Sequence, residues 1–162
     1  MKEDSMERNV RRGVRFNKIA LAVLALLAVV GVWGLLSWFS RPLDDSITPD
    51  GLAENLTDGA LGKTGGVYYV LDSGTDLVDA LDLREWTITK EEAEDEPLVV
   101  FHLWENCELA LYDGGLAYAW NGYASSDTTG SVWYTIPEDT AQTVASLLKT
   151  DGQIETSPGV RF

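Results

Sequence analysis

The chain is short of several residue types on which whole classes of protein depend. It has one cysteine and one histidine among 162 residues. We therefore expect no zinc site built from this chain alone and no intramolecular disulfide. No other metal and no cofactor is predicted from the sequence. Basic residues are also scarce, because 12 Lys and Arg stand against 26 Asp and Glu and leave a net charge of −14. Since affinity for a phosphate backbone comes mainly from Lys and Arg, we expect no nucleic-acid partner.

One stretch of the chain lacks charged residues altogether. Residues 19–39 are 21 uncharged residues dominated by Leu, Ala and Val. At about 1.5 Å per residue, a helix of that length spans a hydrocarbon core of roughly 30 Å. The run therefore predicts a single transmembrane helix, with Trp33, Trp38 and Phe39 at its C-terminal end. It is preceded by four basic residues, namely Arg11, Arg12, Arg15 and Lys18.

The net charge divides at this apolar run. Residues 1–18 carry +3 and residues 40–162 carry −17. Because basic residues stay on the cytoplasmic side, we expect a cytoplasmic stub over 1–18 and an extracytoplasmic, acidic remainder. A cleavable signal peptide is the alternative, since Val32-Trp33-Gly34 is a tolerable cleavage site. The run is longer than the roughly 7 to 15 residues of a signal peptide, which favours an uncleaved anchor in the cell membrane.

The part after the membrane segment is predicted to consist of a linker over 40–66, a folded domain over 67–149 and a tail over 150–162. The linker is rich in Asp, Gly, Pro and Thr, which suits a tether. Inside it, Thr48 as an N-cap before Pro49 predicts a helix of at most two turns.

The domain shows the patterns of an antiparallel sheet. Alternation over 98–104 and 107–112, followed by Asp113-Gly114, predicts two strands that lead into a hairpin. Both sets of alternating residues in 98–104 are largely apolar. Apolar residues at helical spacing predict helices over 76–83 and from Pro137 onward. We therefore predict an α+β fold, a small antiparallel sheet of five or six strands with two short helices.

One motif resembles a catalytic one. Val70-Leu71-Asp72-Ser73-Gly74-Thr75 is similar to the active-site turn of retroviral-type aspartic proteases. Such enzymes need two carboxylates that share a proton, so a domain of this size would have to dimerise and present one Asp72 from each copy. The family's partner motif has no convincing match in this chain. Capping of a helix by Asp72 or Ser73 accounts for the same residues, and we favour that interpretation.

Three further features have both a functional and a structural explanation. The acidic run 91–96 lacks the pattern of a calcium loop and is interpreted as a solvated loop. His102 lies mid-strand among apolar residues and is interpreted as a hydrogen-bonded core residue rather than a ligand or base. Cys107 alternates with Leu109 and Leu111, which predicts a small buried side chain, with an intermolecular disulfide as the alternative.

Aromatic residues are crowded between positions 86 and 134. A small domain needs large side chains to fill its core, so most of them are assigned to packing. Rings on an exposed sheet face can also stack on a sugar or receive a peptide. We select Tyr118, Trp120 and Tyr123 as candidate binding residues. The whole set is Trp86, Phe101, Trp104, Tyr112, Tyr118, Trp120, Tyr123, Trp133 and Tyr134.

Several of these segments together resemble a known group of domains. They are Trp86, the Tyr112-Asp113-Gly114 hairpin, the predicted strand-to-helix junction Trp133-Tyr134-Thr135-Ile136-Pro137, and Leu147-Leu148. Residues 67–148 resemble small uncharacterised extracytoplasmic domains of Gram-positive bacteria, which occur on membrane anchors or lipoproteins. Similar domains follow the membrane part of β-lactam-sensor-type metallopeptidases. The resemblance brings no catalytic residues and implies a ligand-sensing or interaction module at the cell surface.

We therefore expect a single-pass membrane protein, anchored through residues 19–39, whose external domain has no catalytic activity. Its expected role is to bind a protein or another cell-envelope ligand, or to act as an accessory to another envelope protein. The alternative is a membrane-tethered, retropepsin-like aspartic protease that acts as a dimer through Asp72.

Overall fold

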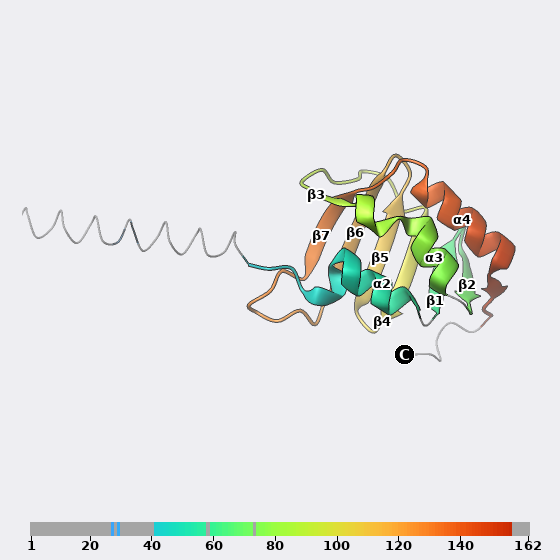
Figure 1. Ribbon diagram of the computed structural model, residues 1–162, viewed down its shortest axis with the longest axis horizontal. Helices are drawn as coiled ribbons and strands as arrows, with labels where there is room; N and C mark the ends of the chain where they lie inside the picture. Colours follow the sequence, from blue (N-terminus) through green and yellow to red (C-terminus); the bar gives the residue numbers. More distant parts are fainter. Residues whose placement is uncertain (1–26, 28, 30–40, 58, 73, 157–162) are drawn as a thin grey trace, which may run out of the picture. The chain divides into compact units, whose positions relative to one another are not determined.

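The computed structural model describes residues 27, 29, 41–57, 59–72 and 74–156, and it divides the chain into the units Met1–Arg41 and Pro42–Phe162 (Figure 1). The predicted stub 1–18 lies outside the described residues. So does the predicted transmembrane segment 19–39, except for Leu27 and Val29, which are both helical. Within the described part of the chain, none of the helices has the length and apolar character needed to cross a bilayer.

The second unit is built on one antiparallel sheet, which contains eight strands among the described residues. Their order across the sheet is β3-β7-β6-β5-β4-β1-β2-β8. The strands are β1 (Ala60–Thr64), β2 (Val67–Leu71), β3 (Thr87–Thr89), β4 (Val99–Trp104), β5 (Cys107–Tyr112), β6 (Leu116–Asn121), β7 (Ser131–Thr135) and β8 (Gln153–Ile154).

Helices cover one face of this sheet (Figure 1). The predicted α+β class is confirmed, but the described residues contain three α-helices rather than two, because the segment assigned to the linker supplies one. The helical elements are the short 3-10 helix η1 (Asp45–Ile47), α2 (Pro49–Thr57), α3 (Gly74–Leu81), the 3-10 helix η2 (Leu83–Glu85) and α4 (Thr140–Asp151).

The predicted linker is wrong over most of its length, because residues 42–66 belong to the fold. Strand β1 lies between β4 and β2 and pairs with both. Ile47, Leu52 and Leu56 from the same segment are fully buried in the core. A tether needs no buried side chains, whereas these three remove substantial apolar area from water. The folded unit therefore begins at Pro42 rather than at Val67.

The helix predicted after Thr48 is present as α2. The Thr48 hydroxyl accepts a hydrogen bond from the Gly51 backbone N–H at 3.2 Å, which is the N-cap geometry expected from the sequence. Leu52 and Leu56, one turn apart, both point into the core. The apolar pair packs the helix on the sheet, and the cap satisfies one of its unpaired backbone donors.

Two boundaries near the C-terminus differ from the prediction. Helix α4 begins at Thr140, three residues after Pro137, because Pro137 and the two residues after it form a turn that leads into the helix. Residues 150 and 151 still belong to α4, and Gln153–Ile154 pair with β2 as strand β8. The predicted tail therefore contributes the last two residues of α4 and an edge strand, while its residues 157–162 lie outside the described part.

The strand register separates the side chains into two sets. Val99, Phe101 and Leu109 face the helices and are fully buried. Their neighbours Val100 and Ala110 point to the opposite side, which no described helix covers and which we call the open face. Core packing does account for three of the aromatic residues, since Trp86, Phe101 and Tyr134 are buried on the helix side.

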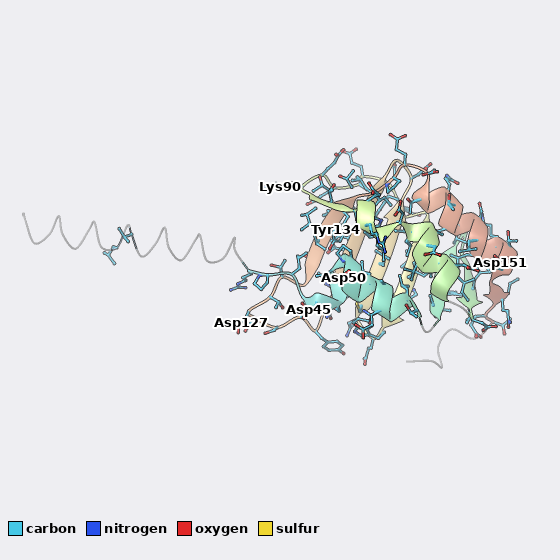
Figure 2. The ribbon with its side chains drawn as sticks, viewed as in Figure 1. Asp45, Asp50, Lys90, Asp127, Tyr134 and Asp151 are labelled. Carbon is cyan, nitrogen blue, oxygen red and sulfur yellow. The ribbon has the colours of Figure 1, made fainter. Side chains whose placement is uncertain are left out.

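Tyr134 ties the sheet to the helical layer. Its hydroxyl donates to the backbone carbonyl of Ile47 at 2.8 Å, and burial raises the pKa of the phenol to about 12. Figure 2 shows Tyr134 in the interior of the folded unit, with the labelled carboxylates of Asp50, Asp127 and Asp151 at its surface. The apolar and acidic residues of this unit are thus separated into core and surface.

The chain crosses the sheet over a long distance between β2 and β3, between β3 and β4 and between β7 and β8, and of these three connections only the one from β3 to β4 contains no described helix. Strand β3 lies at one edge, and β4, the next strand in sequence, lies beyond β7, β6 and β5. Residues 90–98, which we call the crossing loop, make this connection and contain the acidic run 91–96. The loop contains no regular secondary structure, and the acidic residues of the run are exposed, as the sequence predicts for a solvated loop. At its end, the Leu98 backbone N–H donates to the Leu111 carbonyl at 2.8 Å.

Candidate functional site

The open face carries a group of stacked aromatic rings. The ring centroids of Tyr118 and Trp133 are 4.8 Å apart, and those of Tyr112 and Trp133 are 5.2 Å apart. Both pairs are tilted, which is a favourable arrangement for aromatic quadrupoles. All three rings are half-buried although no described helix covers them. A sheet face exposed to solvent is ordinarily polar, so this aromatic group is the most unusual surface feature of the folded unit.

The structure brings together two of the three residues selected from the sequence. Tyr118 and Trp120 are two positions apart on β6 and therefore project from the same, open face. Trp120 is 36% exposed. Tyr123 is 61% exposed and lies off the sheet, in the loop between β6 and β7. The predicted set thus divides into two rings on the open face and one on a neighbouring loop.

A polar network positions the loop that carries Tyr123. The Asn121 side chain, 8% exposed, accepts a hydrogen bond from the Tyr123 backbone N–H at 2.9 Å. The Asn121 amide nitrogen donates to the Asp44 carboxylate at 3.1 Å and to the Ser46 hydroxyl at 2.9 Å. The Thr128 hydroxyl donates to the other oxygen of Asp44 at 3.5 Å. Asp44 and Ser46, at the start of η1, therefore hold both ends of the β6–β7 loop.

Asp44 is the charged centre of this network. Hydrogen bonds lower the pKa of its carboxyl, the largest effect coming from the Ser46 hydroxyl, while burial acts in the opposite direction. A carboxyl whose pKa is lower in the folded than in the unfolded chain stabilises the fold above the unfolded value. That contribution is lost as the pH falls through the folded value. The network is therefore strongest at neutral pH and weakens in acid.

We expect Asp44→Asn to lower the free energy of unfolding by about 1 kcal/mol at pH 7, because the amide cannot replace every hydrogen bond that the carboxylate accepts. Below about pH 4 the difference between the variant and the parent chain should shrink, because protonation weakens the same bonds in the parent. Urea unfolding from pH 7 to pH 3 measures both values. Asp45→Asn, a change at the exposed neighbouring residue, is the control, and a difference that stays constant with pH would contradict the assignment.

His102 is paired on the open face rather than enclosed in the core. Its Nδ1 lies 3.0 Å from the Glu108 carboxylate, directly across the β4–β5 ladder. Its ring centroid is 6.0 Å from that of Tyr68. The predicted hydrogen-bonded histidine is present, but its side chain is 23% exposed and belongs to the same surface as the aromatic group.

Cys107 is fully buried, as predicted. Burial raises the pKa of its thiol to about 11, so the thiolate needed for disulfide exchange is scarce at neutral pH. The intermolecular disulfide weighed for this residue has no accessible sulfur in the folded unit.

Asp72, the candidate catalytic carboxylate, lies at an exposed position after β2 and before α3. Its carboxylate accepts a hydrogen bond from the Gln153 side chain at 3.0 Å. This contact joins the end of β2 to the edge strand β8. Ser73, the other predicted cap, lies outside the described residues.

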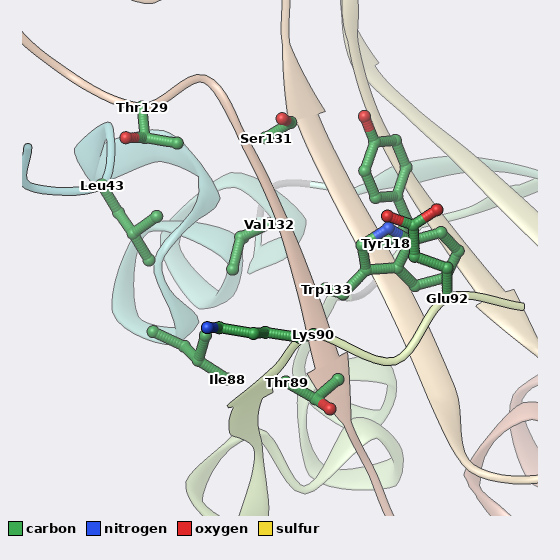
Figure 3. Close-up of a pocket in the computed structure, with 10 residues that line it drawn as sticks. All are labelled: Leu43, Ile88, Thr89, Lys90, Glu92, Tyr118, Thr129, Ser131, Val132 and Trp133. Atoms are coloured by element: carbon green, nitrogen blue, oxygen red, sulfur yellow. The ribbon is translucent and has the colours of Figure 1, made fainter. Parts of the chain in front are cut away.

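A groove of ≈ 600 Å³ opens beside the aromatic group, at the edge of the sheet formed by β3 and β7. We call it the edge groove. In Figure 3, Tyr118, Trp133 and Glu92 lie on one side of β7, and Leu43, Ile88 and Val132 lie on the other. Its volume is in the range typical of sites for small ligands. It is lined by Leu43, Ile88, Thr89, Lys90, Glu92, Tyr118, Thr129, Ser131, Val132 and Trp133.

Two residues that line the edge groove together with Tyr118 are not among the binding residues predicted from the sequence. Trp133 belongs to the aromatic set, and its alternation with Val132 and Tyr134 already places it on the opposite strand face from those two residues. Glu92 is predicted to lie in a solvated loop, and nothing in its local pattern shows that it lines the same groove as the rings. Its place in the groove depends on the strand order, which the sequence alone does not reveal.

No family model, curated protein or solved structure matches the chain. Among the residues that the structure describes, no group of three or more His, Cys, Asp or Glu side chains is arranged to hold a metal ion. The open face and the edge groove are therefore interpreted from their geometry alone.

Proposed function

We propose that this chain is a single-pass membrane protein whose folded unit binds a protein partner at the cell envelope through the open face, without catalysis. The observation that carries the proposal is the stacked group Tyr112, Trp133 and Tyr118 on a sheet face that no described helix covers. Half-exposed aromatic rings with fixed positions are typical anchors of protein interfaces.

The surroundings of the rings support a protein partner. Val100, which is half-buried, extends the apolar surface onto β4, and Trp120 continues it toward the end of β6. His102 and Glu108 add a polar pair at its side. An apolar centre with polar groups at the margin is the usual composition of such interfaces.

The membrane part of the proposal comes from the sequence. The uncharged run 19–39 has the length of a bilayer-spanning helix, and basic residues precede it. In this arrangement the folded unit lies on the extracytoplasmic side, where an acidic domain is repelled by anionic lipid. A protein partner is accordingly favoured over the membrane surface itself.

We expect Trp120→Ser to reduce recovery of cross-linked partners from solubilised membranes by about tenfold or more, because an aromatic anchor at an interface contributes at least about 1.4 kcal/mol. The matched control is Ile154→Ser, which removes another exposed apolar side chain, 66% exposed, from the far edge strand. Both variants are compared by urea unfolding to establish that they fold. Equal recovery of the same partners by both variants and by the parent chain would contradict the proposal.

A further inference from the structure

The edge groove is lined by one carboxylate and two aromatic rings among its other residues. Glu92, Tyr118 and Trp133 line the same cavity, and the two ring centroids are 4.8 Å apart. Figure 3 shows the three side chains gathered on one side of β7. Ring faces attract organic cations through their quadrupole, and a carboxylate supplies the opposite charge and hydrogen-bond acceptors. This end of the groove therefore has the chemistry of a cation site.

The other end of the groove has a different character. Figure 3 shows the Lys90 ammonium beside Ile88, on the side of β7 away from Glu92. A second positive charge is repelled there, so a cationic group is directed to the Glu92 end. The groove thus fixes which part of a ligand lies at which end.

The charge around the groove agrees with a basic ligand. Five of the six residues 91–96 are acidic, and residues 40–162 carry −17. Acidic surroundings raise the rate at which a basic partner is captured and discriminate against acidic ones.

We propose that the edge groove receives a lysine or arginine side chain of the protein partner, with its charged end between Glu92 and the rings of Tyr118 and Trp133. The inference rests on the proposed function and adds the chemistry of the ligand. The groove, at ≈ 600 Å³, has room for a long side chain together with part of its backbone.

The test uses the full-length chain and three fluorescent peptides of equal length, which carry three lysines, three acetyl-lysines or three glutamates. Binding is followed by fluorescence anisotropy at two salt concentrations. We expect the lysine peptide to bind, and the acetylated peptide to bind at least about tenfold more weakly, because acetylation removes the charge. Equal binding of the lysine and acetyl-lysine peptides would overturn the proposal.

Two matched variants locate the site. Glu92→Gln should lower the affinity for the lysine peptide about fivefold, because an exposed ion pair contributes up to about 1 kcal/mol. Glu94→Gln removes the same charge from the same loop, at a residue that does not line the groove, and should change affinity less than about twofold. If both variants weaken binding equally, the peptide responds to net charge alone and the groove is not the site.

The two proposals can fail separately. If Trp120→Ser abolishes partner recovery while the lysine peptide does not bind, the interface stands and its cationic chemistry is wrong. If the lysine peptide binds in a Glu92-dependent manner while Trp120→Ser leaves recovery unchanged, the groove is a cation site that the proposed interface does not use.

Discussion

A fragment that begins at Val67 is expected to remain unfolded, whereas a fragment that begins at Pro42 is expected to unfold cooperatively in urea. The shorter fragment follows the boundary predicted from the sequence, and it lacks strand β1. Because β1 pairs with both β4 and β2, its loss separates β2 and β8 from the rest of the sheet. The backbone groups of β4 that β1 satisfied are then unpaired.

That fragment also loses three buried apolar side chains of the core. Ile47, Leu52 and Leu56 are fully buried, and burial of each such side chain contributes about 1.5 to 3 kcal/mol. Their sum is comparable with the whole stability of a small domain, about 5 to 15 kcal/mol. Far-UV circular dichroism and urea titration distinguish the two fragments. A cooperative transition for the fragment from Val67 would contradict the assignment of 42–66 to the fold.

Gly62→Val is expected to lower the free energy of unfolding by about 3 kcal/mol, which is at the upper end of the usual cost of overpacking a core. Gly62 is a residue of β1 on the face of the sheet that packs against helix α4. A Cβ at this position would lie 2.8 Å from Phe101 Cε1 and 2.9 Å from Leu148 Cδ1. Both neighbours are fully buried, so neither can move aside without displacing others.

Two further variants separate overpacking from other causes. Lys63→Val, at the next residue of β1 on the open face, adds a β-branched residue where there is room and should change stability by less than about 1 kcal/mol. In the Gly62→Val background, Leu148→Ala should cost less than it does alone, because it removes the side chain that the valine meets. Additive effects in this double-mutant cycle, measured by urea unfolding, would contradict the contact.

Much of the fold could be predicted because its strands are distinct in the sequence. The alternation over 98–104 and 107–112 and the turn at Asp113-Gly114 correspond to β4, β5 and the hairpin into β6. Strand β1 was missed for a physical reason. Its inward position between Leu61 and Lys63 is a glycine, because the Phe101 and Leu148 side chains fill that space. The other inward residues of β1 are Ala60 and Thr64, so the strand presents little apolar side chain to the core and has the composition of a loop.

The candidate site could be predicted only in part. Alternation places Tyr118 and Trp120 on one face of β6, but the apolar residues on both faces of β4 leave undecided which face the helices cover. The position of Glu92 depends on the crossing loop, and its path follows from a strand order in which β3 and β4 are far apart. Long-range topology of this kind has no local signal in a single sequence.

The attachment of the folded unit at Pro42 also has a mechanical consequence. The Thr129 backbone N–H donates to the Pro42 carbonyl at 2.8 Å, and the Asp44 N–H donates to the Thr129 carbonyl at 3.0 Å. Tension applied to the chain ahead of Pro42 is therefore borne first by two hydrogen bonds on the loop that carries Tyr123. Leu43 and Thr129 also line the edge groove. A force strong enough to break these two hydrogen bonds therefore distorts the groove before the force is transmitted to the core.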